Sequence, residues 1–294
     1  MTISVLSSNA FGSVSQKKIN DDVSVLNITH QTCQASLSLY GGHVLSWQPQ
    51  GEKEVFWLSK KAEYQQGKAI RGGIPICWPW FGPNIDDQGV NGGNHGFART
   101  NNWQLVRSDI TAQNITLVLE FQSEGEHLMW PDKFKLQQTL VFAETFQQDL
   151  TMTNLSTQSV NFSSALHSYF SVSHPKSVNV MQLNRSPFDD KITAKKNQTD
   201  QLENCIGPID RIYYCQHDQT IIDQQWHRQI NVSSTHCQQW VLWNPGQEIA
   251  DNMDDIHPQG ENEFVCLEAA NTQWQAINAG QSVTVAQHVK ISRL

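Results

Sequence analysis

The dominant pattern along the chain is an alternation of apolar and polar residues with a period of two, which is typical of β-strands. It is clear in residues 114–122, where apolar side chains recur at every second position, namely Ile115, Leu117, Leu119 and Phe121. The same reading predicts two strands in 134–156 and one strand each in 23–29, 35–40, 43–48, 160–173, 229–234, 263–269 and 282–291. Short strands separated by Gly, Asn, Asp and Pro turns predict an all-β, mainly antiparallel fold, either a large sandwich or a barrel.

Helices contribute little to this picture. Short helical turns near 60–66 and 246–255 are the best candidates. The 294 residues could form one or two domains, but no internal repeat and no low-complexity linker divides them. The polar stretch 186–210 is bracketed by predicted strands, so we interpret it as a functional surface loop that shapes the mouth of a site. We therefore predict a single domain over residues 1–294.

Composition narrows the possible compartments. The chain is 38% hydrophobic and has no apolar run long enough to span a membrane, and its first residues lack the basic start and apolar core of a signal peptide. Its six cysteines include no C-x-x-C pair, which disfavours a zinc site and a disulfide framework. We expect a reduced, cytoplasmic protein without a bound metal. Most of the ten tryptophans should fill the core, whereas Trp78, Trp80 and Trp243 are predicted near a functional site.

The formal net charge of −8 disfavours nucleic acid and anionic membranes as partners, because both attract basic surfaces. Any anion site must therefore be built locally. Arg71 and Arg99 could build one, with Lys68 as a possible third cation.

These two arginines lie in loops rich in glycine and aromatic residues: Arg71 in AIRGGIPICWPWFGPN (69–84) and Arg99 in NGGNHGFARTNNW (91–103). Glycine permits close backbone approach, and a guanidinium group can bind phosphate or carboxylate through two hydrogen bonds. Neighbouring aromatic rings offer flat apolar faces against which a sugar can pack. An anionic carbohydrate is the first ligand that these loops suggest, although a surface arginine is more often merely solvated or paired.

Short motifs in a fixed order carry a family resemblance: GGHVLSW (41–47), EVFWLS (54–59), the two arginine loops, LHSYF (166–170), PIDRIYY (208–214), VLWNPG (241–246) and VCLEAAN (265–271). Over nearly its whole length the chain resembles the hexose-6-phosphate mutarotases, also called glucose-6-phosphate 1-epimerases, which are relatives of the galactose mutarotases. The resemblance implies a β-supersandwich of the galactose-mutarotase type, with a sugar phosphate bound across the concave face of one sheet. It also implies an enzyme that needs no cofactor, and we expect it to be a monomer.

Mutarotation opens a cyclic sugar to its aldehyde and closes it on the other face, so it needs a base near O1 and an acid near O5. The resemblance implies that His167 is the acid and Glu268 the base. Histidine suits such proton transfer because its pKa lies near neutrality, and burial would raise a carboxylate pKa. Local sequence alone would favour a different reading, in which His167 is a hydrogen-bonded histidine on a sheet face and Glu268 is a strand-end glutamate that points to water.

The resemblance also implies that Arg71 and Arg99 bind the phosphate. It further suggests that His95, Asn94 and Asp210 contact sugar hydroxyls, although Asp210 follows Gly207-Pro208 and could be an ordinary turn residue. The chain departs from the family at Asn94, where relatives often carry Gln. It departs again at Ala269-Ala270-Asn271, where relatives usually have Pro-Gly after the glutamate.

Three other functions remain open. The first is a mutarotase for neutral aldoses, but such a sugar would give Arg71 and Arg99 no anion to bind. The second is a glycoside hydrolase or lyase, which would normally need two carboxylates beside the bond that is broken, and Asp210 is the only obvious companion of Glu268. A non-catalytic sugar-phosphate sensor would not need both His167 and Glu268. The acidic run 251–257 lacks the regular spacing of a calcium loop and is interpreted as a solvated loop.

Overall fold

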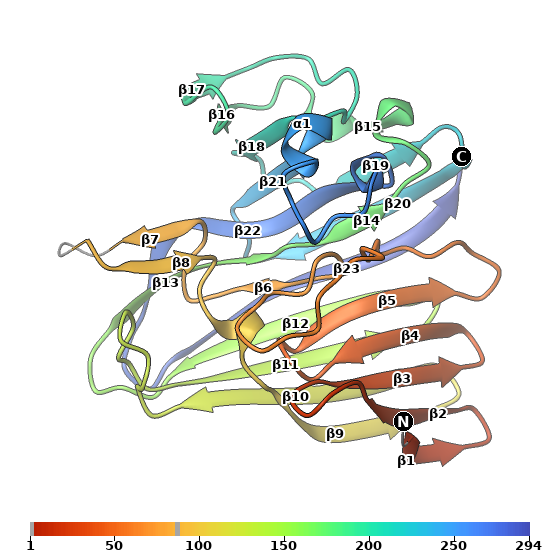
Figure 1. Cartoon of the computed structure of the whole chain (residues 1–294), viewed down its shortest axis with the longest axis vertical. Helices are drawn as coiled ribbons and strands as arrows, with labels where there is room; N and C mark the ends of the chain where they lie inside the picture. The colour runs from red at the N-terminus through yellow and green to blue at the C-terminus, as the bar shows by residue number, and fades with distance from the viewer. Residues whose placement is uncertain (1–2, 86–88) are drawn as a thin grey trace.

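Antiparallel sheets form nearly all of the regular secondary structure in the computed structural model, which describes residues 3–85 and 89–294 (Figure 1). The first sheet is a five-stranded meander in which each strand pairs with the next along the chain. Its strands are β1 (Ile3–Asn9), β2 (Gly12–Lys18), β3 (Ser24–His30), β4 (Cys33–Ser38) and β5 (His43–Pro49).

The second sheet has eight strands and takes them from distant parts of the chain. Its spatial order is β15 (Val178–Val180), β19 (Gln219–Asp223), β20 (Arg228–Thr235), β23 (Ser282–Arg293), β12 (Thr145–Asn154), β11 (Phe134–Phe142), β10 (Ile115–Ser123) and β9 (Gln104–Ile110).

The third sheet also has eight strands and is the one that carries the candidate site. Its spatial order is β17 (Lys195–Gln198), β16 (Phe188–Asp190), β18 (Ile209–Tyr213), β21 (Gln239–Asn244), β22 (Phe264–Ile277), β13 (Val160–Leu166) and β6 (Ile76–Cys77), while β14 (Tyr169–Ser171) pairs with β22 beyond the end of β13. A separate hairpin is formed by β7 (Pro83–Ile85) and β8 (Asn91–Asn94).

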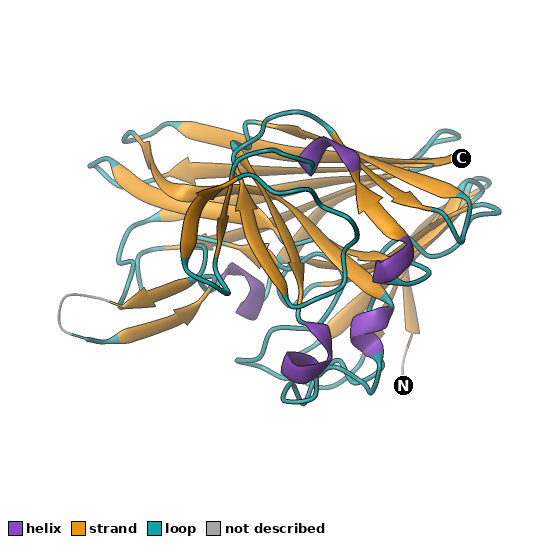
Figure 2. Cartoon of the chain, turned by 90° about the horizontal axis from the view of Figure 1, so that it is seen from above, coloured by secondary structure: helices purple, strands orange, loops and turns teal. Residues whose placement is uncertain are grey.

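Helices are short and lie in the connections between strands (Figure 2). The α-helix α1 spans Gly246–Ala250, and single 3-10 turns occupy Ala98–Thr100, Pro175–Ser177, Met181–Leu183 and Gly260–Asn262. None of the described helices combines the length and apolar character that crossing a membrane would require.

The second sheet is the layer on which the other two pack. Trp47 of β5 lies with its ring 5.7 Å from that of Phe146 in β12, and Trp78, which follows β6, lies 4.4 Å from Phe134 in β11. All four side chains belong to one buried hydrophobic cluster that takes residues from every large sheet. Burying each such side chain stabilises the fold by roughly 1.5–3 kcal/mol.

The strands expected from alternation are confirmed, because each predicted range contains a strand. The observed strands differ from the predicted ones in two respects. The predicted strand 160–173 is interrupted at His167 and Ser168, between β13 and β14. The strands β1, β2 and β9 were not predicted, because they bury few side chains and carry little apolar alternation. The strands β18, β19 and β21 were also missed, although β19 and β21 bury most of their side chains. Of the two helical candidates, 246–255 contains α1, whereas 60–66 contains a turn and no helix.

Candidate active site

The register of the third sheet places His167 opposite Glu268. Leu166 pairs with Ala269 and Tyr169 pairs with Cys266, so the position between them sets His167 against Glu268 across neighbouring antiparallel strands. Side chains in directly opposite positions point to the same face of a sheet. Accordingly His167 Nε2 lies 3.4 Å from Glu268 Oε1, with both side chains buried.

A second row of side chains lies two residues further along the same strands, and therefore on the same face. In this row Tyr169 pairs with Cys266, Cys266 with Trp243, and Trp243 with Asp210. One sheet face thus presents Asp210 from β18 and Tyr169 from β14 beside the His167–Glu268 pair.

The segment between β5 and β6 brings Arg71 to this face. The Arg71 carbonyl accepts a hydrogen bond from Ser59 N (3.1 Å), and Gly73 N donates to Trp57 O (2.7 Å). Gly73 has a φ of 61°, and a Cβ atom there would lie 2.1 Å from Val44 O, so only glycine fits. The close backbone approach at Gly73 fixes the path of the chain two residues after Arg71, and so the place from which the Arg71 side chain extends toward the cavity.

The β7–β8 hairpin and the turn after it supply Asn94, His95 and Arg99. At Gly96 a Cβ atom would lie 1.9 Å from Trp78 O, so this turn can pack against the third sheet only with glycine there. Arg99 Nη2 donates to Asn94 O (2.9 Å), while Arg99 Nε is buried and has no partner among the described residues. Arg99 Nη1 likewise has no hydrogen-bond partner among the described residues, and because Arg99 lines the cavity, this part of its guanidinium group is suited to receive an anion.

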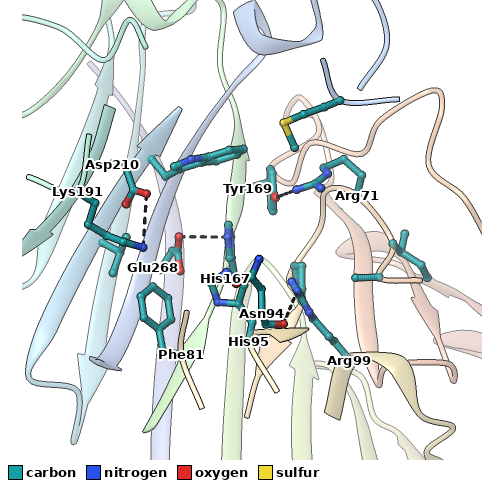
Figure 3. A pocket seen from close by; sticks show the side chains of 16 residues that line it. Arg71, Phe81, Asn94, His95, Arg99, His167, Tyr169, Lys191, Asp210 and Glu268 are labelled. Carbon is teal, nitrogen blue, oxygen red and sulfur yellow. Dashed lines mark hydrogen bonds and ion pairs between the residues drawn. The ribbon is translucent and has the colours of Figure 1, made fainter. Parts of the chain in front are cut away.

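All seven residues predicted for the site line one cavity of about 270 Å³. Figure 3 shows Arg71 and Arg99 on one side of the cavity, Lys191 and Asp210 on the opposite side, and His167 and Glu268 between them. The other lining residues are Ala69, Ile70, Pro75, Phe81, Tyr169, Lys191, Val241, Trp243 and Met253. The cavity therefore has two arginines at one end and the His167–Glu268 pair near its middle.

Burial sets the protonation of the central pair. Glu268 is 1% exposed, and burial, with Asp210 nearby, raises its pKa well above the ordinary carboxyl value. His167 is 8% exposed, and burial, together with the neighbouring His95 and arginines, lowers its pKa well below the ordinary histidine value. Both shifts favour the neutral form of each group, that is, a protonated Glu268 carboxyl group beside an uncharged His167 imidazole. The carboxyl group therefore carries the one proton that the two groups can exchange.

His95 is fixed as a hydrogen-bond donor toward the cavity. Its Nδ1 accepts from Gly82 N (3.2 Å), so the neutral ring carries its proton on Nε2. Burial and the positive charge of Arg99 lower its pKa to about 3, which keeps the ring neutral in the physiological range. The ring centroids of His95 and His167 lie 5.8 Å apart.

Arg71 is held from behind by two partners. Its Nε donates to Asp255 Oδ2 (3.0 Å) and its Nη1 donates to the Tyr169 hydroxyl (2.8 Å). Burial opposes the charge of the guanidinium, yet Tyr169 and Asp255 raise its pKa above the ordinary value, so Arg71 stays charged. Among the described residues its Nη2 group has no protein acceptor and remains available to a ligand.

Several expectations need correction. Trp78 and Trp80 do not line the cavity, because both are 1% exposed and pack in the hydrophobic core; of the three tryptophans named, only Trp243 lines it. Lys68 pairs with Glu63 on the surface, and the lysine that lines the cavity is Lys191.

The acidic run 251–257 is not simply a solvated loop, since its Asp255 pairs with Arg71 and its Met253 lines the cavity. The stretch 186–210 does border the site, because it contributes Lys191, whose Nζ lies 3.5 Å from Asp210 Oδ2. It is not simply a loop, however, because it contains β16 and β17. After Glu268, residues 269–271 continue β22 instead of turning. Among residues 3–85 and 89–294, no group of three or more His, Cys, Asp or Glu is arranged to hold a metal ion.

Comparison with known proteins adds a family match. Residues 24–290 match the family described as aldose 1-epimerase. The chain is 35% identical over 284 residues to an Escherichia coli (strain K12) protein named "Putative glucose-6-phosphate 1-epimerase", covering 95% of this chain and 94% of that one.

Solved structures share the fold. A Salmonella typhimurium protein described as "a putative mutarotase (YeaD)" has a TM-score of 0.89 and 33% identity, covering 99% of this chain and 97% of that chain. Galactose 1-epimerase from Lactobacillus acidophilus NCFM has a TM-score of 0.71 and 10% identity, with 99% of each chain covered, which shows the fold alone. The prediction of an all-β fold of the galactose-mutarotase type is confirmed.

Proposed function

The chain belongs to the aldose 1-epimerase family, and we propose that it is a mutarotase that interconverts the α and β anomers of glucose 6-phosphate and related hexose 6-phosphates. The observation that carries this proposal is the combination, in one cavity, of a buried histidine–glutamate pair with two arginines that keep N–H groups without a partner among the described residues. The names of the E. coli and S. typhimurium relatives support the same chemistry.

In the proposed mechanism, the proton of the Glu268 carboxyl group first passes to His167, which lies 3.4 Å away. The Glu268 carboxylate then accepts the proton of the O1 hydroxyl while protonated His167 donates a proton to the ring oxygen O5. The C1–O5 bond breaks, the open-chain aldehyde forms, and rotation about C1–C2 presents its other face. Ring closure runs the two transfers in reverse, so the pair ends with the protons it began with. No atom is gained or lost by the sugar, and no electron acceptor is needed.

The remaining residues bind and orient the substrate. Arg71 and Arg99 bind the 6-phosphate at the cationic end of the cavity, and His95 donates through Nε2 to a sugar oxygen. Asp210, with Lys191 beside it, accepts from a sugar hydroxyl at the opposite end. Trp243 lines the cavity between these ends and offers an apolar face to the ring.

The alternatives fit the cavity less well. A neutral aldose would leave the free N–H groups of Arg71 and Arg99 without an anion, at a cost for each unpaired buried group. Hydrolysis would need a second carboxylate free to act with Glu268, but the other lining carboxylate, Asp210, is paired with Lys191.

The proposal is tested by following freshly dissolved α-glucose 6-phosphate by proton NMR, in buffer without phosphate, with free glucose in parallel. We expect the protein to bring glucose 6-phosphate to anomeric equilibrium much faster than buffer alone and to act on glucose weakly. A rate equal to that of buffer would refute the enzyme. Saturable binding of glucose 6-phosphate without turnover would point instead to a sensor.

The pKa shifts predict an unusual pH profile for kcat. The pair gains a second proton only below the lowered pKa of His167, and loses its single proton only above the raised pKa of Glu268. We therefore expect kcat, measured between about pH 5.5 and 7.5, to show no step at the ordinary histidine pKa of about 6.5. KM should rise as the pH falls through about 6, because the phosphate dianion then gains a proton and becomes a monoanion.

The measurement is kcat and KM for glucose 6-phosphate across this range, after subtraction of the buffer-catalysed rate at each pH. A single ionisation near about pH 6.5 in kcat would mean that His167 titrates as an ordinary histidine, against the protonation scheme above.

A further inference from the structure

Three glutamines occupy positions in the second sheet where apolar residues would be expected. Gln138 lies in the buried row of β11 between Leu136 and Leu140, and Gln148 lies in the buried row of β12. Gln287 lies between two buried valines of β23. All three glutamines are at most 1% exposed. A buried amide costs free energy unless it is hydrogen-bonded, so three together require an explanation.

The three amides form a continuous chain of hydrogen bonds, which we call the glutamine ladder. Gln287 Nε2 donates to Gln148 Oε1 (2.7 Å), and Gln148 Nε2 donates to Gln138 Oε1 (2.5 Å). At one end, Ser168 Oγ donates to Gln287 Oε1 (3.0 Å). At the other end, Gln138 Nε2 donates to Gly42 O (2.7 Å). Every bond runs in the same direction, so each polarises the next.

The ladder joins all three large sheets at the positions that carry the site. Ser168 belongs to the break between β13 and β14 in the third sheet, directly after His167. Gly42 immediately precedes β5 in the first sheet, and its neighbour Gly41 donates through its N–H to Asn101 O (2.7 Å), two residues beyond Arg99. The ladder therefore spans the core from the acid–base pair to the segment that holds an arginine.

The orientations of two adjacent side chains explain how the ladder acts on His167. His167 lines the cavity, whereas Ser168, the next residue, is fully buried and bonds to Gln287 of the second sheet, so the two side chains point to opposite sides of the third sheet. Holding Ser168 Oγ at a fixed place in the core fixes the rotation of this short segment about its axis. The His167 backbone is held at one further point, where its N–H donates to Pro75 O (3.1 Å).

We propose that Ser168, Gln287, Gln148 and Gln138 are positioning residues that set the orientation of His167 toward Glu268 and the substrate. This inference rests on the mutarotase function proposed above. Packing alone would be served better by apolar side chains, because such groups fill these positions without the cost of burying amides. The ladder instead fixes the position of Ser168 Oγ, and so restrains the orientation of the adjacent His167, which the reaction requires.

The test replaces the four ladder side chains together. A variant with Gln138→Met, Gln148→Met, Gln287→Met and Ser168→Ala keeps side-chain volume nearly constant and leaves one former partner, the Gly42 carbonyl, without its donor, so we expect a modest loss of stability. We expect a folded protein whose kcat falls by about 10- to 100-fold, because a displacement of about 1 Å at a reacting group has that effect. KM for glucose 6-phosphate should change less than about threefold, since the arginines lie on other segments.

Three further variants keep the result interpretable. Ser168→Ala should lower kcat more than Ser168→Thr, which keeps the hydroxyl, and this pair carries the test if the four-residue variant does not fold. Gln219→Met removes another fully buried glutamine, one that donates to His217 O and lies outside the ladder. It should lower thermal stability and leave kcat unchanged.

The failure of this inference differs from failure of the proposed function. If the wild type turns over glucose 6-phosphate and the folded four-residue variant has the same kcat, the ladder does not position His167, but the proposed mutarotase function still stands. If the wild type has no turnover, the ring ¹⁵N chemical shifts of His167 provide the measurement. A changed shift in the variant supports the positioning role, and an unchanged shift overturns it.

Discussion

Replacing Glu268 with glutamine should lower kcat for glucose 6-phosphate anomerisation by about 10²–10⁴-fold and leave KM nearly unchanged. The amide has nearly the same size as the carboxyl group, so the cavity keeps its shape. It cannot accept the O1 proton, however, and the transfer with His167 loses one partner. Because burial already favours the neutral carboxyl group, exchanging it for a neutral amide should cost little stability.

His167→Ala should have an effect of the same order, and the double variant should lose little more than the worse single variant, because the two groups act as a unit. Glu261→Gln is the matched control: Glu261 is also buried, at 5% exposed, but does not line the cavity, so kcat should not change. Wild-type kcat in Glu268→Gln would remove the glutamate from the mechanism. Simple addition of the two single losses would show that His167 and Glu268 act independently.

Local alternation predicted many of the strands but missed β18 and β21, which carry part of the site, and it could not predict which strands pair. His167 and Glu268 are 101 residues apart in the chain, and they meet because β13 and β14 share one register on β22. Register is set by pairing over such distances, which no local pattern encodes. The family resemblance supplied what the pattern lacked, and all seven residues that it indicated line the same cavity.

The residues that the sequence analysis missed lack a local signal. Lys191 and Asp255 lie in polar stretches that look like solvated loops, and only tertiary packing brings them to Asp210 and Arg71. Trp78 and Trp80 were misplaced for the opposite reason: their loop suggested a site, but their large rings fill the core.

The ladder did have a signal in the sequence. Glutamine stands at the inward phase of three strands, as in Leu136-x-Gln138-x-Leu140, where alternation predicts an apolar residue. A polar residue in an inward phase indicates either a wrong strand assignment or a buried hydrogen-bond network. What the sequence could not give is the order of the partners, because the ladder crosses from one sheet to another between Ser168 and Gln287.

The second large effect concerns the phosphate. Arg71→Ala and Arg99→Ala should each raise KM for glucose 6-phosphate by about 10- to 100-fold, because a hydrogen bond to a charged group contributes roughly 1.5–3 kcal/mol. Any residual turnover of free glucose should be unaffected, so the preference for the phosphorylated sugar should fall by the same factor. Lys68→Ala is the charge-matched control, since Lys68 is an exposed cation paired with Glu63 and does not line the catalytic cavity.

Arg71 and Arg99 should differ in one respect, because only Arg71 is paired with a carboxylate. Removing Arg71 leaves Asp255 uncompensated beside the phosphate position, which adds repulsion to the loss of the hydrogen bonds. Adding Asp255→Asn to Arg71→Ala should therefore recover part of the affinity, whereas adding it to Arg99→Ala should not. Steady-state kinetics with glucose 6-phosphate and glucose measure both effects. Equal losses for the two sugars would place the phosphate elsewhere and leave Arg71 and Arg99 as structural residues.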